Sequence, residues 1–599
     1  MTTIRKIRIA DKYIPWLLFA GTIAIYFPAV YFSVDIFDDT SYVNRLFLSD
    51  LSELDIRDYL FSPVLGLSSP LVMFSFLLDR LIWKPEILAN GMHFTNILCH
   101  AAGTVVFYRI CRKLTVRILG SSKTFRLKLS PCWSAITVIF WAFHPQRVES
   151  VVWISERKDV LLTLFFFCSI SFFIDSYRKS KISLAAIVLF VASLAVKPML
   201  LTMPAILWVW MKTESGKFFS KRNIVQLIPY CVICSGLLFF YIFFRNITPF
   251  AADCGTVFFR LKIIFWNIAN YFRSAVVPTE LMPFYPFYSP AYYSLFPAFI
   301  FPVCVCVLAI AGRKTYAVKN IILPVLLLFP VTLLPVCGIH RIGNVDWADR
   351  YNIIPSLFLL FPAIFLMNYW GRKYVVWQKY TVLGCVCYAL FLISTTISYL
   401  PCWKSLSTVK FASTADIPNP NYRIMFLHAM TAFLNNDFVS TAEISAKISE
   451  NSVCTPYDKK MIRVYHTGII GLLQSAGNSP DAGGKTLTKL LLSEDIRYCA
   501  RISSEFVDIA VAASVYWNLH KKDIATAIKL YETAAAYSRS DYGGQIMQIQ
   551  AAFLKNDFVR AQQILSDLQK KIPDSNVVAA LKKQLDVLQS QNQKKQYEK

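Results

Sequence analysis

Charged side chains are scarce in this sequence: Asp, Glu, Lys and Arg together make up 17 % of its 599 residues, whereas apolar residues make up 55 %. A soluble domain usually has about a quarter of its residues charged, so the composition excludes an ordinary soluble protein for most of the chain. Long apolar segments separated by short basic loops recur up to about residue 399, and the remainder is polar. We interpret this change near residue 400 as a passage from bilayer to water.

Acidic residues are outnumbered as well: 37 Asp and Glu stand against 62 Lys and Arg, a formal net charge of +25. A nucleic-acid-binding protein would gather this excess on one face, but here the cations fall in every second loop between apolar segments. The positive-inside rule accounts for such a pattern. We therefore expect no nucleic-acid partner, a cytoplasmic N-terminus, and an outer location for everything after residue 400.

Two further patterns are missing. None of the 15 cysteines has the spacing to a histidine that a zinc site requires, so most are interpreted as small apolar side chains. The first apolar segment, from about Ile14, lacks a small-residue cleavage site. This indicates a retained first span rather than a removed signal.

The apolar segments predict an all-α fold, with a polytopic transmembrane helical bundle over residues 1–400 and a soluble helical domain over 401–599. The bundle is expected to have about eleven spans, two of which form a broken or tilted hairpin around Lys197 and Pro198. The aromatic but charged segment 258–277 is expected to be an interfacial helix. The predicted spans are 14–34, 90–110, 131–147, 160–177, 183–197, 199–211, 224–244, 291–311, 320–336, 352–370 and 380–399.

The polar tail contains an internal repeat. KDIATAIKLY (522–531) and NDFVRAQQIL (556–565) place Asp523 and Asp557 34 residues apart, and Ala527 and Ala561 keep the same spacing. This is the tetratricopeptide period, in which a small alanine lets the paired helices pack closely. A further copy, AFLNNDFV (432–439), is out of phase, so we expect a degenerate tetratricopeptide-like solenoid.

Ionisable residues beside the predicted spans are the candidates for function, because a membrane protein keeps few of them there. Four groups stand out, and the charge pattern places all four on the outer side. The first is the adjacent pair Asp38 and Asp39, whose mutual repulsion can raise one pKa and leave the other ready as a base or metal ligand. A solvated acidic loop is the alternative interpretation.

The other three groups combine cations with carboxylates. In the loop WAFHPQRVESVVWISERKD (141–159), the cations suit a phosphate leaving group, and a salt-bridged interfacial turn is the alternative. Lys197 either snorkels to the interface or meets an anionic lipid headgroup. In HRIGNVDWADRY (340–351), Arg350 is suited to bind phosphate with Asp349 orienting it, unless the two form an internal ion pair.

Taken in order, HPQRVESVVWISERKDVL (144–161), SLAVKPMLLTMP (193–204), ADRYNIIPS (348–356) and Trp403 before a helical array resemble one family. They resemble the bacterial membrane proteins with tetratricopeptide repeats that are related to the eukaryotic transmembrane-and-tetratricopeptide O-mannosyltransferases. The resemblance covers nearly the whole chain. It implies a GT-C fold and the transfer of a sugar from a polyprenyl-phosphate carrier to an acceptor outside the cytoplasm.

The resemblance also implies roles for individual residues. The family's acidic motif matches Asp38 and Asp39, and its other motifs match charged residues in the three later groups; phosphate binding is assigned to the cations on their chemistry. We expect catalysis from Asp38, Asp39, His144 and Glu149, donor-phosphate binding from Arg157, Lys158, Lys197 and Arg350, and support from Asp159, Asp349 and His340. The cofactor candidate is a divalent cation, Mg²⁺ or Mn²⁺, at Asp38 or Asp39.

The resulting hypothesis is a glycosyltransferase that moves a monosaccharide from a lipid-linked polyprenyl-phosphate donor to a protein or glycan hydroxyl. It would lie in a bacterial inner membrane, in contact with membrane lipid, with its repeat domain in the periplasm. One alternative is a non-catalytic membrane-anchored scaffold for envelope or glycan assembly. Another is a transporter of lipid-linked sugars, which would need polar residues along a path through mid-membrane that the sequence hardly provides.

Overall fold

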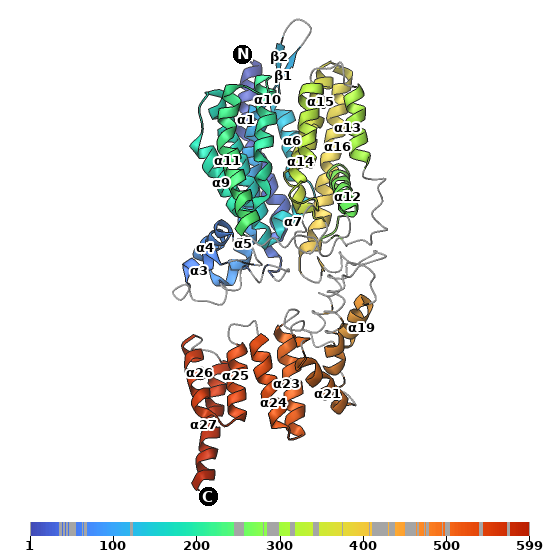
Figure 1. Ribbon diagram of the computed structural model, residues 1–599. Coiled ribbons are helices and arrows are strands. Elements are labelled where there is room, and N and C mark those ends of the chain that lie inside the picture. Colours follow the sequence, from blue (N-terminus) through green and yellow to red (C-terminus); the bar gives the residue numbers. More distant parts are fainter. Residues whose placement is uncertain are drawn as a thin grey trace. The chain divides into compact units, whose positions relative to one another are not determined.

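Helices dominate both units into which the chain divides, Met1–Asn421 and Tyr422–Lys599 (Figure 1). The structure is a computed structural model. It describes residues 2–34, 39, 42, 46, 55–62, 64, 69–119, 124–244, 257–279, 281–283, 285, 299–311, 318–338, 347–373, 375–405, 408, 409, 429, 438–449, 463, 466–472, 474, 479–493, 495, 496, 504–537, 543–571 and 576–597.

The first unit is a bundle of helices linked by short 3-10 turns and one hairpin. Its elements are α1 (Thr2–Tyr26), η1 (Phe27–Tyr31), α3 (Ile56–Phe61), α4 (Pro70–Ile82), η2 (Pro85–Ile87), α5 (Leu88–Lys113), β1 (Thr115–Leu119), β2 (Thr124–Lys128), α6 (Pro131–Ala142), α7 (Arg147–Val152), η3 (Ile154–Glu156), α8 (Arg157–Arg178), α9 (Leu184–Val196), η4 (Pro198–Thr202), α10 (Met203–Ser215), α11 (Lys221–Phe244), α12 (Val257–Val276), α13 (Ile300–Ala311), η7 (Val318–Ile322), α14 (Leu323–Leu333), η8 (Asp349–Asn352), α15 (Leu357–Lys373), α16 (Val375–Tyr399) and η9 (Leu400–Trp403).

Helix α5 is central to this bundle, because it packs against α1, α6 and α8. Aromatic side chains fill the contact: the ring of Phe107 stacks on Phe167 at 4.8 Å between centroids, and Trp141 meets both rings edge-on. Such pairs add to the free energy gained from burying apolar area. The packing fixes the start of α8 against the start of α5, where the charged residues of the loop 141–159 lie.

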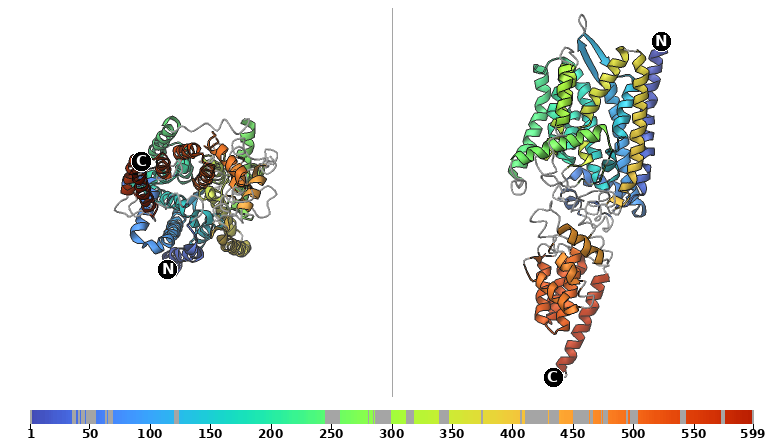
Figure 2. Two further views of the ribbon diagram at one scale, coloured as in Figure 1. Left: turned by 90° about the horizontal axis from the view of Figure 1, so that it is seen from below. Right: turned by 90° about the vertical axis from the view of Figure 1, so that its right-hand side faces the viewer.

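The two ends of the bundle carry different elements. Figure 1 shows the N-terminus and the β1–β2 hairpin at one end, and α3, α4 and α7 at the other. The hairpin is antiparallel, pairs Arg117 with Arg126, and lies in a predicted basic loop. It is the described exception to the expected all-α fold. The turned view in Figure 2 shows the same bundle with the hairpin at its tip.

Proline residues end the helices where the site begins. Helix α6 stops at Ala142, three residues before Pro145, and α9 stops at Val196, two before Pro198. A residue that precedes proline is driven out of the helical region, and Lys197 accordingly has extended angles of φ −156° and ψ 125°. The chain therefore leaves the helix at Lys197, and His144 likewise lies between α6 and α7.

The predicted number of spans is wrong. Four helices in the described part of the chain are long and apolar enough to cross a membrane, not about eleven: Asp11–Tyr31, Ile154–Arg178, Lys221–Phe240 and Gln378–Trp403. Five more apolar helices have only 10–17 residues, because prolines such as Pro145 and Pro198 interrupt the apolar segments. Helix α5 has 26 residues but carries His93, Asn96 and His100 on its apolar face.

The second unit is a row of helices in which each packs against the next: α21 (Pro480–Leu491), α23 (Ser504–His520), α24 (Ile524–Tyr537), α25 (Gly543–Leu554), α26 (Phe558–Lys571) and α27 (Asn576–Tyr597), with α19 (Phe438–Ser449) before them. Ala527 and Ala561 are fully buried at helix contacts. The sequence copy at 432–439 lies mostly outside the described residues. The helical nature of this domain is confirmed, and its assignment to tetratricopeptide repeats stays a prediction.

Candidate functional site

Six charged side chains gather at the end of the first unit that carries α7. Their exposed fractions lie between 0 and 14 %, so they form an almost buried ionic network. They come from three parts of the chain: the consecutive elements α7, η3 and α8, the turn after α9, and η8. We call them the ionic cluster: Glu149, Glu156, Lys158, Asp159, Lys197 and Arg350.

Glu156 lies at the centre of the ionic cluster. Its Oε1 is 3.5 Å from Nζ of Lys158 and 3.5 Å from Nε of Arg350, and its Oε2 is 3.4 Å from Nζ of Lys197. One carboxylate thus draws together three cations that would otherwise repel one another. The cations point at a common place, which is the arrangement that a doubly charged phosphate requires.

Two of the three cations, Lys197 and Arg350, are each held by a second carboxylate. Nζ of Lys197 is 2.5 Å from Oδ1 of Asp159, whose other oxygen accepts a hydrogen bond from the Ser150 hydroxyl at 3.0 Å. The Arg350 guanidinium pairs with Glu149, and the Arg350 backbone N–H donates to Glu149 Oε2 at 3.0 Å. Buried charges are tolerated when they are paired in this way, so the network fixes the cation positions.

Aromatic rings cover the cations. Nζ of Lys158 lies 4.9 Å from the ring centre of Tyr42, and Nζ of Lys197 lies 5.0 Å from that of Tyr351. The Arg350 guanidinium lies 5.4 Å from Trp153 and 4.8 Å from Tyr351. These contacts stabilise the cations and keep water from them.

Asp39 reaches the cluster from the loop after the first span. Its side chain is fully buried, and its Oδ1 accepts a hydrogen bond from the backbone N–H of Ser155 at 2.8 Å. Ser155 immediately precedes Glu156, so the structure brings this predicted residue to the turn that carries the central carboxylate. Asp38, predicted to act with Asp39, and His340, predicted as a supporting residue, lie outside the described residues.

Asp349 belongs to a second network next to Arg350. The Gln146 amide donates to its Oδ1 at 2.9 Å and the Tyr285 hydroxyl to its Oδ2 at 2.8 Å. It therefore does not form the internal ion pair with Arg350 that the sequence left open; Arg350 pairs with Glu149 and Glu156 instead. Asp349 holds η8 in place against the loop that precedes α7.

Arg157 faces away from the cluster. It pairs with Asp79 of α4, and its Nε and Nη2 donate to Asn96 Oδ1 at 2.7 Å and to the Met92 carbonyl at 2.6 Å. Its side chain has no exposed area. Arg157 therefore links α8 to α4 and α5. Its guanidinium does not face the place where the cluster cations converge, where it was predicted to contact phosphate.

Burial shifts the pKa values of two carboxyl groups outside the spans. It raises the pKa of Glu149 to about 7, against the lowering effect of the nearby Arg350. It also raises the pKa of Asp349 to about 6, although the hydrogen bonds from Gln146 and Tyr285 favour the charged form. Both groups therefore change protonation close to neutral pH.

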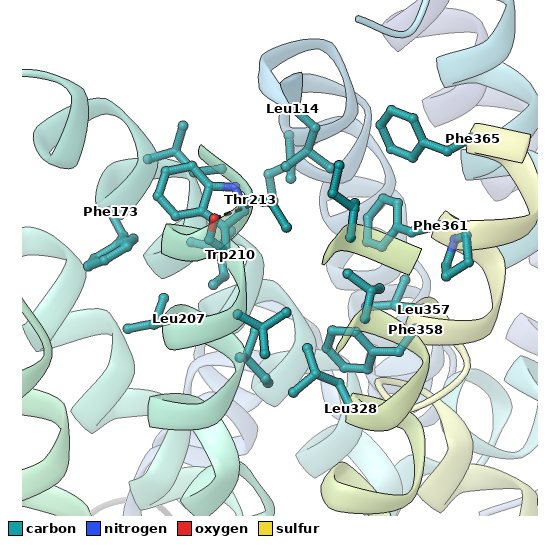
Figure 3. Close-up of a pocket in the computed structure, with 18 of the residues that line it drawn as sticks. Leu114, Phe173, Leu207, Trp210, Thr213, Leu328, Leu357, Phe358, Phe361 and Phe365 are labelled. Atoms are coloured by element: carbon teal, nitrogen blue, oxygen red, sulfur yellow. Dashed lines mark hydrogen bonds between the residues drawn. The ribbon is translucent and has the colours of Figure 1, made fainter. Parts of the chain in front are cut away.

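An apolar cavity lies between α5, α8, α10, α14 and α15 (Figure 3). Its lining includes Phe173, Trp210, Leu328 and Phe361, and the hydroxyl of Thr213 is satisfied by the Trp210 carbonyl at 2.7 Å. Leu357 and Phe358, at the start of α15, line it as well. Helix α15 follows η8, which carries Arg350. A cavity of this composition suits a hydrocarbon chain.

No group of three or more His, Cys, Asp or Glu side chains within the described ranges is placed to hold a metal ion. The predicted divalent-cation site at Asp38 and Asp39 involves a residue outside those ranges. It stays a prediction, and the chemistry below uses only the side chains of the chain.

The chain is similar over part of its length to protein O-mannosyl-transferases. It is 32 % identical over 91 residues to protein O-mannosyl-transferase TMTC4 of Homo sapiens, a match that covers 15 % of this chain and 12 % of that protein. It is 25 % identical over 203 residues to protein O-mannosyl-transferase F38B6.6 of Caenorhabditis elegans, covering 34 % of this chain and 26 % of the relative. No known family profile matches.

These matches span about an eighth and a quarter of the two curated relatives. They confirm in part the resemblance seen in the sequence motifs, and they support a glycosyltransferase-like function with a sugar donor and an acceptor. Together with the apolar helices they indicate a membrane protein. The GT-C fold, the bacterial source and the lipid carrier stay predictions.

Sequence reasoning noticed Glu156 in its charged loop but assigned it no role, although it contacts more cluster cations than any other carboxylate described. Its neighbours Tyr42, Trp153 and Tyr351 were also missed. The available signal was the density of opposite charges in ERKD (156–159), which suggests internal pairing. Which carboxylate meets which cation depends on contacts across as many as 201 positions, and a single sequence does not contain that information.

Proposed function

We propose that this protein is a membrane glycosyltransferase that moves a monosaccharide from a polyprenyl-phosphate donor to a hydroxyl of a protein or glycan. The observation that carries the proposal is the convergence of Lys158, Lys197 and Arg350 on Glu156, with Asp39 at the same turn. The names of the relatives favour mannose as the sugar and a protein as the acceptor.

The reaction needs a base for the acceptor and cations for the leaving phosphate. The acceptor hydroxyl oxygen bonds to the anomeric carbon while the bond from that carbon to the phosphate oxygen breaks. The hydroxyl proton passes to a carboxylate, for which Asp39 or the adjacent Asp38 is the proposed base. The polyprenyl phosphate leaves with the bonding electron pair, and the cluster cations stabilise the charge that develops on it.

Exposure orders the cations by their access to a substrate. The Lys197 side chain is 14 % exposed, Lys158 and Arg350 are each 9 % exposed, and Arg157 is not exposed at all. We therefore assign the phosphate contact to Lys197 first, with Lys158 and Arg350 beside it. Arg157 becomes a positioning residue, as do Glu149 and Asp159, because they hold cations rather than face the substrate.

The membrane supplies the setting for this chemistry. The apolar cavity of Figure 3 offers space for part of the hydrocarbon chain of the donor. We place the ionic cluster on the non-cytoplasmic face, since the basic hairpin and the N-terminus lie at the opposite end of the bundle (Figure 1). A bacterial inner membrane with a periplasmic repeat domain is the proposed location.

The test is transfer in proteoliposomes that contain the full chain, a polyprenyl-phosphate-linked hexose and a peptide rich in Ser and Thr, with mass spectrometry to detect a hexose on a hydroxyl. Replacing Asp38 and Asp39 together by Asn is expected to reduce transfer at least about a hundredfold, the range for loss of a general base. Asp175→Asn is the control, because Asp175 pairs with Lys113 at the other end of α8. Undiminished transfer by the folded double variant would refute the proposed base.

A further inference from the structure

A second cavity of the first unit has a polar end and apolar walls. It lies between α6, α12, α15 and α16, and its lining includes His144, Arg147 and Ser356 together with Phe140, Ile364 and Tyr388. The remaining lining is apolar apart from one threonine. It shares no lining residue with the cavity of Figure 3. One end of this space therefore suits a charged or polar group, and the rest suits hydrocarbon.

Arg147 is the distinctive residue of that polar end. Its side chain is completely buried, and its Nη2 donates to the Asn352 carbonyl at 3.3 Å and to the Ser356 hydroxyl at 3.1 Å. Its Nε and Nη1 are buried and have no hydrogen-bond partner among the described residues. Arg157, Lys197 and Arg350, by contrast, each meet a carboxylate.

The sequence of α7 separates this cation from the ionic cluster. Arg147 and Glu149 are two positions apart on the helix, and residues at that spacing do not face each other. Glu149 turns to Arg350, while Arg147 lines the second cavity. Arg147 and Glu149 are thus neighbours along the chain, but Arg147 faces the second cavity and Glu149 faces the ionic cluster.

A buried cation with unsatisfied donors is costly. Leaving a charged group without its partners in an apolar environment is strongly unfavourable, and guanidinium remains protonated at any physiological pH. An anion at the polar end would supply an acceptor oxygen to one of these two donors, which diverge on the guanidinium plane, in a charge-assisted hydrogen bond of the kind that phosphate makes with Arg. The apolar walls require that this anion be attached to a hydrocarbon chain.

We propose that this cavity binds a lipid by its phosphate head, with Arg147 as the anchor and the hydrocarbon chain packed along α15 and α16. The shared chemistry is a phosphate ester on an apolar tail, which either a polyprenyl phosphate or an anionic phospholipid supplies. The site is separate from the ionic cluster and does not depend on the proposed transfer, because binding is measured without a sugar or an acceptor.

Two substitutions test the head and the tail separately. Arg147→Gln removes the charge and keeps a hydrogen-bonding side chain. Gly384 lines the cavity, and a Cβ at this position would meet nothing within 4 Å, so Gly384→Leu places a side chain in the tail space without touching a charge. Its matched control is Gly236→Leu on α11, where a Cβ also has nothing within 4 Å. Arg57→Gln, at an exposed arginine, controls for loss of one charge.

The full chain is purified in detergent and mixed in turn with a prenyl phosphate, phosphatidic acid, diacylglycerol and inorganic phosphate. Native mass spectrometry measures how much of each ligand binds. We expect the two phosphate lipids to bind more tightly than diacylglycerol or inorganic phosphate. We expect at least about a tenfold loss in both test variants, since a charge-assisted hydrogen bond contributes roughly 1.5–3 kcal/mol, and no loss in the controls. Preference for the prenyl phosphate would identify the carrier as the ligand, and preference for phosphatidic acid a membrane phospholipid.

Equal retention of diacylglycerol and phosphatidic acid would overturn the proposal, because Arg147 would then contribute nothing to selection of the head group. Unchanged binding in Gly384→Leu would overturn it as well. If Arg147→Gln does not fold, Gly384→Leu still decides the outcome, since it leaves the polar end intact.

Discussion

The ionic cluster combines three carboxylates, Glu149, Glu156 and Asp159, with three cations. Glu156 occupies the place where Lys158, Lys197 and Arg350 converge, so in the proposed reaction the donor phosphate would compete with Glu156 for the same cations. In that proposal, the carboxylate would hold the cations together before the donor binds, which would remove the cost of assembling them. Glu149 plays a different part, because it grips Arg350 through both the side chain and the backbone N–H.

The raised pKa of Glu149 predicts how transfer depends on pH. Below about pH 7 this carboxyl is protonated and its ion pair with Arg350 is lost, so we expect transfer to fall up to tenfold for each further pH unit. In Glu149→Gln that acid limb should disappear from the profile of transfer rate against pH, at a lower plateau. A limb of the same position and slope in the variant would mean that another group titrates.

Stability should respond in the opposite direction. The pKa of Glu149 in the folded chain lies above its ordinary value of 4.5, so its contribution to stability is complete below pH 4.5 and is lost as pH rises through 7. Thermal unfolding of the wild-type chain at pH 5 and pH 8, compared with Glu149→Gln, measures this loss independently of activity.

Individual charged residues were predictable from the sequence, and their partners were not. Glu149, Lys158, Lys197 and Arg350 could be named because ionisable groups beside apolar spans rarely occur without a role. Arg157 looks the same in the sequence as its neighbour Lys158, yet the two point in different directions, to Asp79 and to Glu156. Adjacent residues on a helix face different sides, and only the packing of α4 and α5 decides which side is which.

At the scale of elements, proline was the signal that the span prediction underused. The predicted span 131–147 runs across Pro145, whereas the break around Lys197 and Pro198, between the predicted spans 183–197 and 199–211, agrees with the structure. The structure ends α6 and α9 before these prolines and places His144 and Lys197 in the breaks. An interrupted helix leaves backbone groups that need hydrogen-bond partners within the protein or in a water-filled cavity. Such breaks therefore tend to lie at polar sites inside the bundle, as they do here.

The repeated turn of the second unit, in contrast, follows from the sequence spacing. Lys522 and Asn556 both adopt left-handed angles, with φ of 61° and 56°. The following residues, Asp523 and Asp557, each accept a hydrogen bond from the backbone N–H three positions later, at 3.0 and 3.1 Å. The same local geometry thus starts α24 and α26, as expected for two copies of one unit.

Ala561 tests whether that spacing matters for packing. It is fully buried between helices, so Ala561→Leu should destabilise the unit by about 1–3 kcal/mol, the usual cost of overpacking. Val559→Leu on the same helix is the control, because Val559 is 83 % exposed. Limited proteolysis of the full chain measures the difference as faster cleavage within 543–597. Equal cleavage rates would show that the close contact at Ala561 is dispensable.

At the scale of the whole molecule, the enzyme hypothesis and the scaffold alternative make different predictions, because every proposed reacting group lies in one unit. The ionic cluster, Asp39 and both cavities belong to Met1–Asn421. Because that unit has its own buried core and contains all of these residues, the chemistry should not need Tyr422–Lys599. A scaffold, in which the helical row binds the partners, would lose its function with that unit.

We therefore expect a chain that ends after residue 421 to transfer sugar to a short hydroxyl peptide at about the rate of the full chain, and to act poorly on folded protein acceptors. The physical reason is that a short peptide needs only the reacting groups, whereas a large acceptor needs a surface to hold it. The comparison uses both chains in the same liposomes, with thermal unfolding to show that the shorter one is folded. A folded short chain that transfers nothing, beside an active full chain, would place an essential group in the second unit and disprove the assignment of catalysis to the first.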